Sequence, residues 1–265
     1  MFHKIFKLTL IIILSYQTPL YSKSTSFNEL NARELSNYFS GIVAFENKEN
    51  SDALKFFNSS KILINKHDPY LKKYVYSLVL ENKVSQSINV IKNRGDENNT
   101  NFFDAYLLLI IDSLKKNDFK KAEKYLAKIT KLNELDRLNP VITGILKNFI
   151  YTFNKKEILY NDVNFGNISL ISQAFQRCYL KKDSTRSSFL NLINNPNGDY
   201  SRYKFFYANF LIENKKIEEV KDIFDKVEFI DSTLLLSQGK IWAENNEYKK
   251  FTKIFSCRNH NDIVS

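Results

Sequence analysis

The chain has 265 residues, of which 43% are hydrophobic and only six are Gly and four are Pro. This apolar content supports a sizeable core in one or two domains, and the scarcity of Gly and Pro favours helices over sheet. The formal charge is +10, but only seven of the 39 basic residues are Arg and the Lys residues are scattered among acidic ones, which argues against a nucleic-acid-binding protein.

Residues 1–22 have the pattern of a secretory signal peptide. Lys4 and Lys7 precede an apolar run from Leu8 to about Tyr16, and a proline and the small Ser22 follow. A membrane span needs about 20 apolar residues, so a retained anchor is the lesser alternative. We expect cleavage after Ser22 and export, which means the periplasm in a cell with an outer membrane. Contact with the membrane would end when the signal peptide is removed.

A short polar step rich in Asn and Lys recurs between apolar, helix-patterned segments. Its centres are Lys48, Asn82, Asn117, Lys215 and Asn246. The first three are separated by 34 and 35 residues and the last two by 31, and a period near 34 is typical of helix–turn–helix repeats. Weaker steps at Lys155 and Lys182 lie in the long gap. Asn and Lys at these centres predict residues that end one helix in the left-handed conformation, or as a polar turn, before the next helix begins.

Small residues and aromatic residues recur at fixed places around these steps. The best sets are Gly41, Ala44, Ala53 and Phe57; Leu109, Ser113, Ala122 and Leu126; Ala208, Leu211, Val220 and Phe224; and Gly239, Trp242, Phe251 and Phe255. In this pattern the chain resembles the tetratricopeptide repeat (TPR) family over most of residues 29–255. The resemblance implies an all-α fold, a right-handed superhelix of antiparallel helix pairs (an α-solenoid). Another array of α-hairpins stays open as the alternative.

The resemblance also assigns packing residues and a domain plan. The residues expected to pack within and between repeats are Gly41, Ala53, Phe57, Ala122, Ala208, Phe224, Gly239 and Phe255. We expect about seven helix pairs in residues 23–265. Residues 29–138 and 200–257 hold the better-matched repeats, whereas residues 139–199 are either divergent units or a join between two arrays.

Residues 258–265 read as the start of another first helix, because Asn261 and Asp262 are good N-terminal residues ahead of an apolar pair. A solenoid normally finishes with a polar-faced capping helix. The sequence therefore predicts that the natural protein continues into further repeats beyond Ser265.

No pattern in the sequence points to catalysis. Cys178 and Cys257 fall on apolar faces of predicted helices, where free cysteine behaves as a small hydrophobe, so we expect no bridge although export permits one. Cys257 and His260 form a C-x-x-H pair without the second pair that structural zinc needs. His67 lacks the supporting motif of a catalytic triad. We expect no catalytic residue, cofactor or metal.

The resemblance implies that the first helices of the pairs line a concave face that binds a protein or a peptide. On that register the partner-binding residues are Lys72, Tyr76, Arg202, Asn209 and Lys240. We expect an exported, non-catalytic scaffold or assembly factor that binds no nucleic acid. One alternative is the helical arm of a larger envelope enzyme, for example a murein-cleaving enzyme, with its catalytic domain beyond Ser265. A third possibility is that the basic surface binds anionic lipid or glycan.

Overall fold

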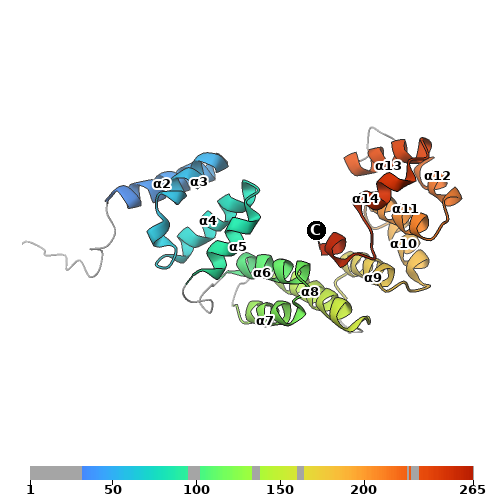
Figure 1. Cartoon of the computed structure of the whole chain (residues 1–265), viewed down its shortest axis with the longest axis horizontal. Coiled ribbons are helices and arrows are strands. Elements are labelled where there is room, and N and C mark those ends of the chain that lie inside the picture. Colours follow the sequence, from blue (N-terminus) through green and yellow to red (C-terminus); the bar gives the residue numbers. More distant parts are fainter. Residues whose placement is uncertain are drawn as a thin grey trace, which may run out of the picture. The chain divides into compact units, whose positions relative to one another are not determined.

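The chain is helical throughout the part that the computed structural model describes, which is residues 32–94, 102–132, 138–159, 164–225, 227 and 233–264. These residues form fourteen α-helices and one short 3-10 helix, with no strand among them (Figure 1). The prediction of an all-α fold is confirmed. The predicted signal peptide, residues 1–22, lies outside the described residues. Within the described ranges, no helix combines the length and the apolar character that a bilayer span requires.

The chain divides into two compact units with their boundary between Lys83 and Val84. Unit 1 ends at Lys83 and contains α2 (Ala32–Glu46), α3 (Asn50–Asn58), η2 (Lys61–Leu63) and α4 (Asp68–Leu80). Its three α-helices all pack against one another. The core between them combines aliphatic side chains with a cluster of aromatic rings that includes Phe57, Tyr70 and Tyr74.

Unit 2 runs from Val84 onward and holds the other eleven described helices. They are α5 (Val84–Lys92), α6 (Phe103–Lys115), α7 (Phe119–Ile129), α8 (Leu138–Lys155), α9 (Asn167–Tyr179), α10 (Thr185–Ile193), α11 (Tyr203–Glu213), α12 (Glu218–Asp225), α13 (Leu234–Glu244), α14 (Tyr248–Ile254) and α15 (His260–Val264). Each helix from α5 to α13 packs against the next helix along the chain. This nearest-neighbour pattern is that of helical repeats.

The turns between helices lie where the polar steps predict them. The non-glycine residues with positive φ in the described chain are Lys48, Asn82, Asn117, Lys156, Lys181, Lys215 and Asn246, with φ between 54° and 65°. The five strong predictions are therefore confirmed, and each of the two weaker ones is displaced by one residue. At Asn117, for example, the reversal lets Asp118 N donate to the Ser113 carbonyl at 2.8 Å, which satisfies a carbonyl at the end of α6.

All eight residues expected to pack within and between repeats are buried. The two glycines among them are small for a visible reason. A Cβ at Gly41 would lie 2.7 Å from the Phe57 ring, and a Cβ at Gly239 would lie 2.9 Å from Phe224 and 3.0 Å from Phe205. At Gly41 and at Gly239 the helix backbone lies so close to an aromatic ring that a residue with a side chain would not fit without a shift of the ring.

The cysteines correct the sequence analysis. Cys178 in α9 and Cys257 form a disulfide with Cα atoms 5.7 Å apart, so the expectation of unbridged cysteines is wrong. Cys257 lies in a turn after α14 and not on a helical face. The two cysteines are 79 residues apart, and only the packing of the intervening helices brings them together.

The segment after Cys257 returns to the middle of unit 2. A short helix begins there at His260, because the side chain of Asn259 accepts the N–H of Asn261 at 3.1 Å. This helix, α15, packs on α6, and His260 Nε2 lies 3.1 Å from the Leu114 carbonyl (Figure 1). The ring of His260 also packs edge-on to Phe153 of α8, at 5.6 Å between centroids.

Candidate functional site

Two predicted partner-binding residues, Lys72 and Tyr76, lie one turn apart on α4. The helix buries Tyr70, Leu71, Tyr74, Val75 and Leu78 in unit 1. Lys72 and Tyr76 are offset from this buried stripe and are only half-buried. The 3.6-residue period of α4 therefore keeps part of both side chains accessible.

Tyr76 meets a second aromatic ring from the neighbouring helix α2. The rings of Tyr76 and Phe45 stack with centroids 6.5 Å apart and an interplanar angle of 19°. Lys72 Nζ lies 5.8 Å from the Tyr76 centroid, and Lys73 Nζ lies 4.3 Å from the Phe45 centroid. Lys73 also pairs with Glu46. We call Phe45, Lys72, Lys73 and Tyr76 the aromatic ledge.

Buried tyrosine hydroxyls hold the helices beneath the ledge. Tyr70 donates to the Phe57 carbonyl at 2.6 Å, and Tyr74 donates to Asn58 Oδ1 at 2.8 Å. Burial raises the pKa of both hydroxyls, and at Tyr70 the neighbouring Tyr74 adds to the effect. Both groups stay protonated at neutral pH, so they act as fixed donors that tie α4 to the end of α3.

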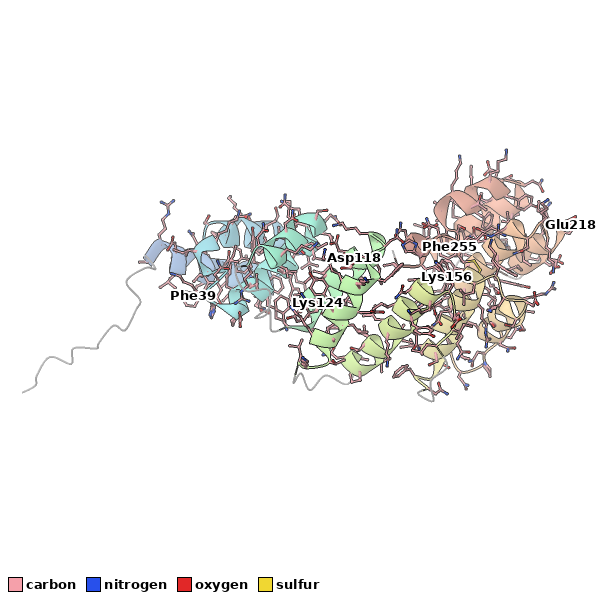
Figure 2. All side chains as sticks on the ribbon, turned by 60° about the horizontal axis from the view of Figure 1, so that its bottom comes forward. Phe39, Asp118, Lys124, Lys156, Glu218 and Phe255 are labelled. Atoms are coloured by element: carbon pink, nitrogen blue, oxygen red, sulfur yellow. A yellow bond between two sulfur atoms is a disulfide. The ribbon has the colours of Figure 1, made fainter. Side chains whose placement is uncertain are left out.

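The exposed face of α2, on the side away from Phe45, carries two apolar side chains. Phe39 and Val43 stand one turn apart on α2 and are 60% and 61% exposed. Figure 2 shows the position of Phe39. Aromatic and aliphatic side chains at such positions suit contact with apolar side chains of a partner. The ledge itself presents ring faces and two ammonium groups, which suit aromatic and carboxylate groups.

In unit 2, the three predicted residues do not form one surface. The prediction that Asn209 faces a partner is wrong, because Asn209 is 1% exposed and its Nδ2 donates to the Phe205 carbonyl at 3.2 Å. Lys240 Nζ donates to the Val227 carbonyl at 2.7 Å, where it ties α13 to the segment after α12. Arg202 is exposed at the N-terminus of α11 and donates to the Tyr203 hydroxyl at 3.0 Å.

Sequence reasoning missed Phe45 and Lys73. Helical spacing places an aromatic residue at Phe45 beside the buried stripe of α2, where it cannot be told from a core residue. Its stacking on Tyr76 depends on how α2 packs against α4, which no local pattern encodes. Across the residues that the structure describes, no group of three His, Cys, Asp or Glu side chains is placed to hold a metal ion.

Comparisons with known proteins place few constraints on this chain. No family model matches it, and no solved structure matches it. It is 26% identical over 265 residues to botulinum neurotoxin type E of Clostridium botulinum, in a match that covers 93% of this chain. The chain spans only 19% of the length of that toxin. The likeness therefore shows no family.

Proposed function

We propose that this protein is an exported, non-catalytic scaffold or assembly factor that binds a protein or a peptide through the aromatic ledge. The observation that carries the proposal is the stacking of Phe45 on Tyr76 across two helices, with a lysine ammonium group near each ring. We further propose that the helix pairs follow one another in a TPR-like right-handed superhelix. The recurrent left-handed turns and the nearest-neighbour packing within unit 2 support that arrangement.

The ledge has the physical character of a binding hot spot. Tyr and Trp are enriched in hot spots because a rigid ring supplies much contact area at little cost in side-chain entropy. Stacking and burial of the inner edges already order both rings in the free protein. An incoming side chain would cover the outer faces and gain contact area without first having to fix the rings.

The test is a direct binding measurement on an identified partner. The chain without residues 1–22 is used to capture proteins from an envelope extract, and a captured protein is then titrated against it. Tyr76→Ala and Phe45→Ala should each weaken binding about tenfold or more, as expected for hot-spot rings. Leu80→Ala on the same helix is the matched control, because Leu80 is 53% exposed and lies outside the ledge.

Unchanged affinity in both ring variants, with helicity preserved, would refute the ledge as the binding site. Export is tested separately. The protein recovered from the periplasm of a producing cell should begin at Lys23, as read by mass spectrometry of its N-terminus. Recovery from the cytoplasm with Met1 still in place would contradict the proposed location.

A further inference from the structure

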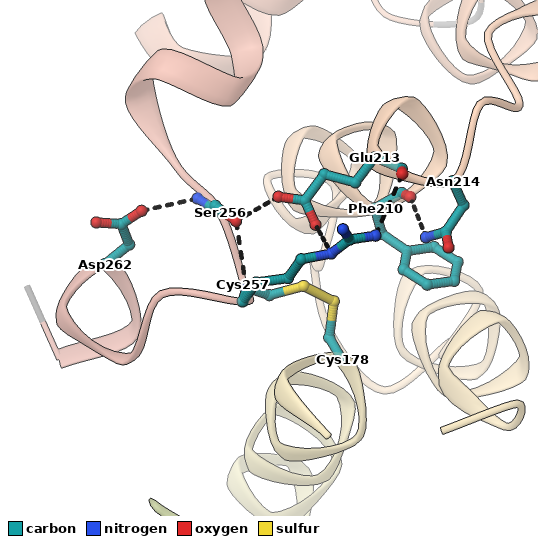
Figure 3. Close-up of polar contacts among 8 residues, drawn as sticks. Cys178, Phe210, Glu213, Asn214, Ser256, Cys257 and Asp262 are labelled. Atoms are coloured by element: carbon teal, nitrogen blue, oxygen red, sulfur yellow. Dashed lines mark hydrogen bonds and ion pairs between the residues drawn. A yellow bond between two sulfur atoms is a disulfide. The ribbon is translucent and has the colours of Figure 1, made fainter. Parts of the chain in front are cut away.

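A pocket of about 280 Å³ lies in unit 2 beside the disulfide. Three segments form it: the turn between α9 and α10, the end of α11 with the turn after it, and the turn after α14 (Figure 3). Five of its eleven lining residues are basic, namely Lys181, Lys182, Arg186, Lys216 and Arg258. In the whole chain only 39 of 265 residues are basic, so the positive charge is concentrated here.

The helical repeat brings two of these lysines to one place. Lys182 and Lys216 each follow a left-handed residue, Lys181 and Lys215 respectively, and are 34 residues apart. The amide of Lys182 donates to the Arg177 carbonyl at 2.9 Å, and that of Lys216 donates to the Leu211 carbonyl at 2.9 Å. The two lysines therefore occupy the same position in successive hairpins, and both line the pocket.

This position carries a different type of side chain in most of the other hairpins. The residues that follow the left-handed turns elsewhere are Glu49, Lys83, Asp118, Glu157 and Glu247. Asp118 shows what an acidic residue does there, because its side chain accepts the Lys121 N–H at 3.1 Å and caps α7. Glu49 and Glu247 form no such cap, and both hairpins at the pocket carry an ammonium group at this position, as one other hairpin does at Lys83.

The arginines are already paired. Arg258 Nε lies 3.1 Å from Glu213 Oε2, and its Nη2 donates to the Glu213 carbonyl at 3.2 Å (Figure 3). Ser256 Oγ donates to the other oxygen of the same carboxylate. Arg186 forms two contacts with Glu219, at 2.8 and 3.0 Å. Both arginines are therefore neutralised, and they hold the walls in place.

The lysines are different. The ammonium groups of Lys181, Lys182 and Lys216 form no ion pair or hydrogen bond with any residue that the structure describes. Asp183 supplies one negative charge to the lining. After the two arginine–glutamate pairs are set aside, the pocket carries an excess of two positive charges. Its inner wall is the Cys178–Cys257 bridge, which covalently joins two of the three segments.

We propose that this pocket binds a compact oxyanion with two negative charges, a phosphate or sulfate group. The inference is independent of the aromatic ledge, which lies in unit 1. Lysines hold such groups as mobile point charges, and three of them around one cavity match a tetrahedral dianion better than a single carboxylate. Two sources share this chemistry: the free ion, and a phosphate or sulfate group carried on a sugar, for which the volume leaves room.

The test uses the folded, disulfide-bonded protein and calorimetric titration in sodium chloride. The probes are inorganic phosphate, inorganic sulfate and glucose 6-phosphate. The double variant Lys182→Gln/Lys216→Gln should lose about tenfold or more in affinity for each probe that binds. The control is Lys120→Gln/Lys124→Gln on α7, which removes the same charge from exposed positions that do not line the pocket and should bind like the parent protein. Figure 2 shows the position of Lys124.

Tighter binding of glucose 6-phosphate than of phosphate would support the site and identify a sugar-borne group, whereas equal binding would support the site for the free ion. The absence of saturable binding by the parent protein would overturn the proposal. So would equal losses in the pocket variant and the control variant, because these would reflect net charge alone. All substituted lysines are exposed, so folding should be unaffected.

Discussion

Units 1 and 2 are built from similar helix–turn–helix segments, but they are held together differently. In unit 1 the tyrosine hydroxyl contacts of Tyr38, Tyr70 and Tyr74 join residues no more than 29 positions apart. In unit 2 the disulfide spans 79 residues, and the contact of His260 with the Leu114 carbonyl spans 146. Repeats need only neighbour contacts to fold. The disulfide and the His260 contact therefore join distant parts of unit 2, and the described residues of unit 1 show no contact over a comparable sequence separation.

The largest expected effect comes from breaking the disulfide. Cys178→Ala/Cys257→Ala should destabilise unit 2 by about 4 kcal/mol, because a crosslink over 79 residues restricts the unfolded chain. The single tryptophan, Trp242, packs on Phe251 in unit 2, so its fluorescence during urea unfolding reports that unit. We expect a lower fluorescence midpoint, while the part of the circular dichroism transition that belongs to unit 1 stays in place. An unchanged midpoint of the tryptophan fluorescence transition would contradict the claim that the disulfide stabilises unit 2.

The matching test in unit 1 is Gly41→Ala. The added Cβ would lie 2.7 Å from the fully buried Phe57 ring, and the overpacking should exceed the gain in helix propensity by about 1 kcal/mol. The part of the circular dichroism transition that belongs to unit 1 should move to a lower urea concentration, while the midpoint followed by tryptophan fluorescence stays unchanged. Ser36→Ala is the control, because Ser36 is exposed on the same helix and its replacement should be neutral or slightly stabilising.

Acid should weaken unit 2 through Asp112, which joins α5 to α6. Burial alone would raise the pKa of Asp112, but hydrogen bonds from Lys116 and Lys92 and their charges outweigh it and lower the pKa. The two contacts measure 2.8 and 2.6 Å. A lowered folded-state pKa means that the stabilisation is present above the unfolded pKa near 4 and is lost as the pH falls through the folded value.

The variant Asp112→Asn should therefore cost about 1 kcal/mol at pH 7 and less at pH 3. Urea midpoints followed by Trp242 fluorescence at both pH values provide the measurement. Asp183→Asn is the control, because Asp183 is exposed and should not change the difference between the two midpoints. If Asp112→Asn costs the same at both pH values, the ion pairs do not stabilise unit 2.

The smallest effect concerns the turns, which the two units share. Lys48 in unit 1 and Lys215 in unit 2 adopt φ of 65° and 61°, a region that costs a lysine more than a glycine. Lys48→Gly and Lys215→Gly should each stabilise their own unit by about 0.5 kcal/mol, after the entropy of the more flexible unfolded chain is subtracted. Asn117→Gly should gain less, because Asn tolerates this conformation. Thermal midpoints of the three variants test that order.

Much of the local structure could be predicted from the sequence. The turns at Lys48, Asn82, Asn117, Lys215 and Asn246 each lie in a short polar step that interrupts an apolar, helix-patterned run, so a local pattern specifies them. In the two weaker steps the residue with positive φ, Lys156 or Lys181, lies one position from the predicted centre. Each of these steps contains two consecutive lysines, and the sequence pattern does not indicate which of the two adopts the left-handed conformation.

The candidate sites were less predictable. The sequence indicated Tyr76 and Lys72, but it gave no sign that Phe45 would stack against Tyr76. It placed Asn209 on an accessible face, and the packing of α11 buries that residue instead. A one-residue difference in the assumed register turns a helical side chain by about 100° around the helix axis. Such a difference leaves the predicted fold unchanged, but it decides whether a given residue faces solvent or the core.

The sequence by itself determined that the protein is helical and where one helix ends and the next begins. It also determined which small and aromatic residues pack at the contacts between helices. These properties depend on residues within a few positions of one another. The tertiary structure alone decided that Cys178 meets Cys257, that His260 returns to α6, and that Lys182 and Lys216 share a pocket. Such meetings depend on the summed geometry of all the helices between, and small differences in each crossing angle accumulate beyond what a local pattern can specify.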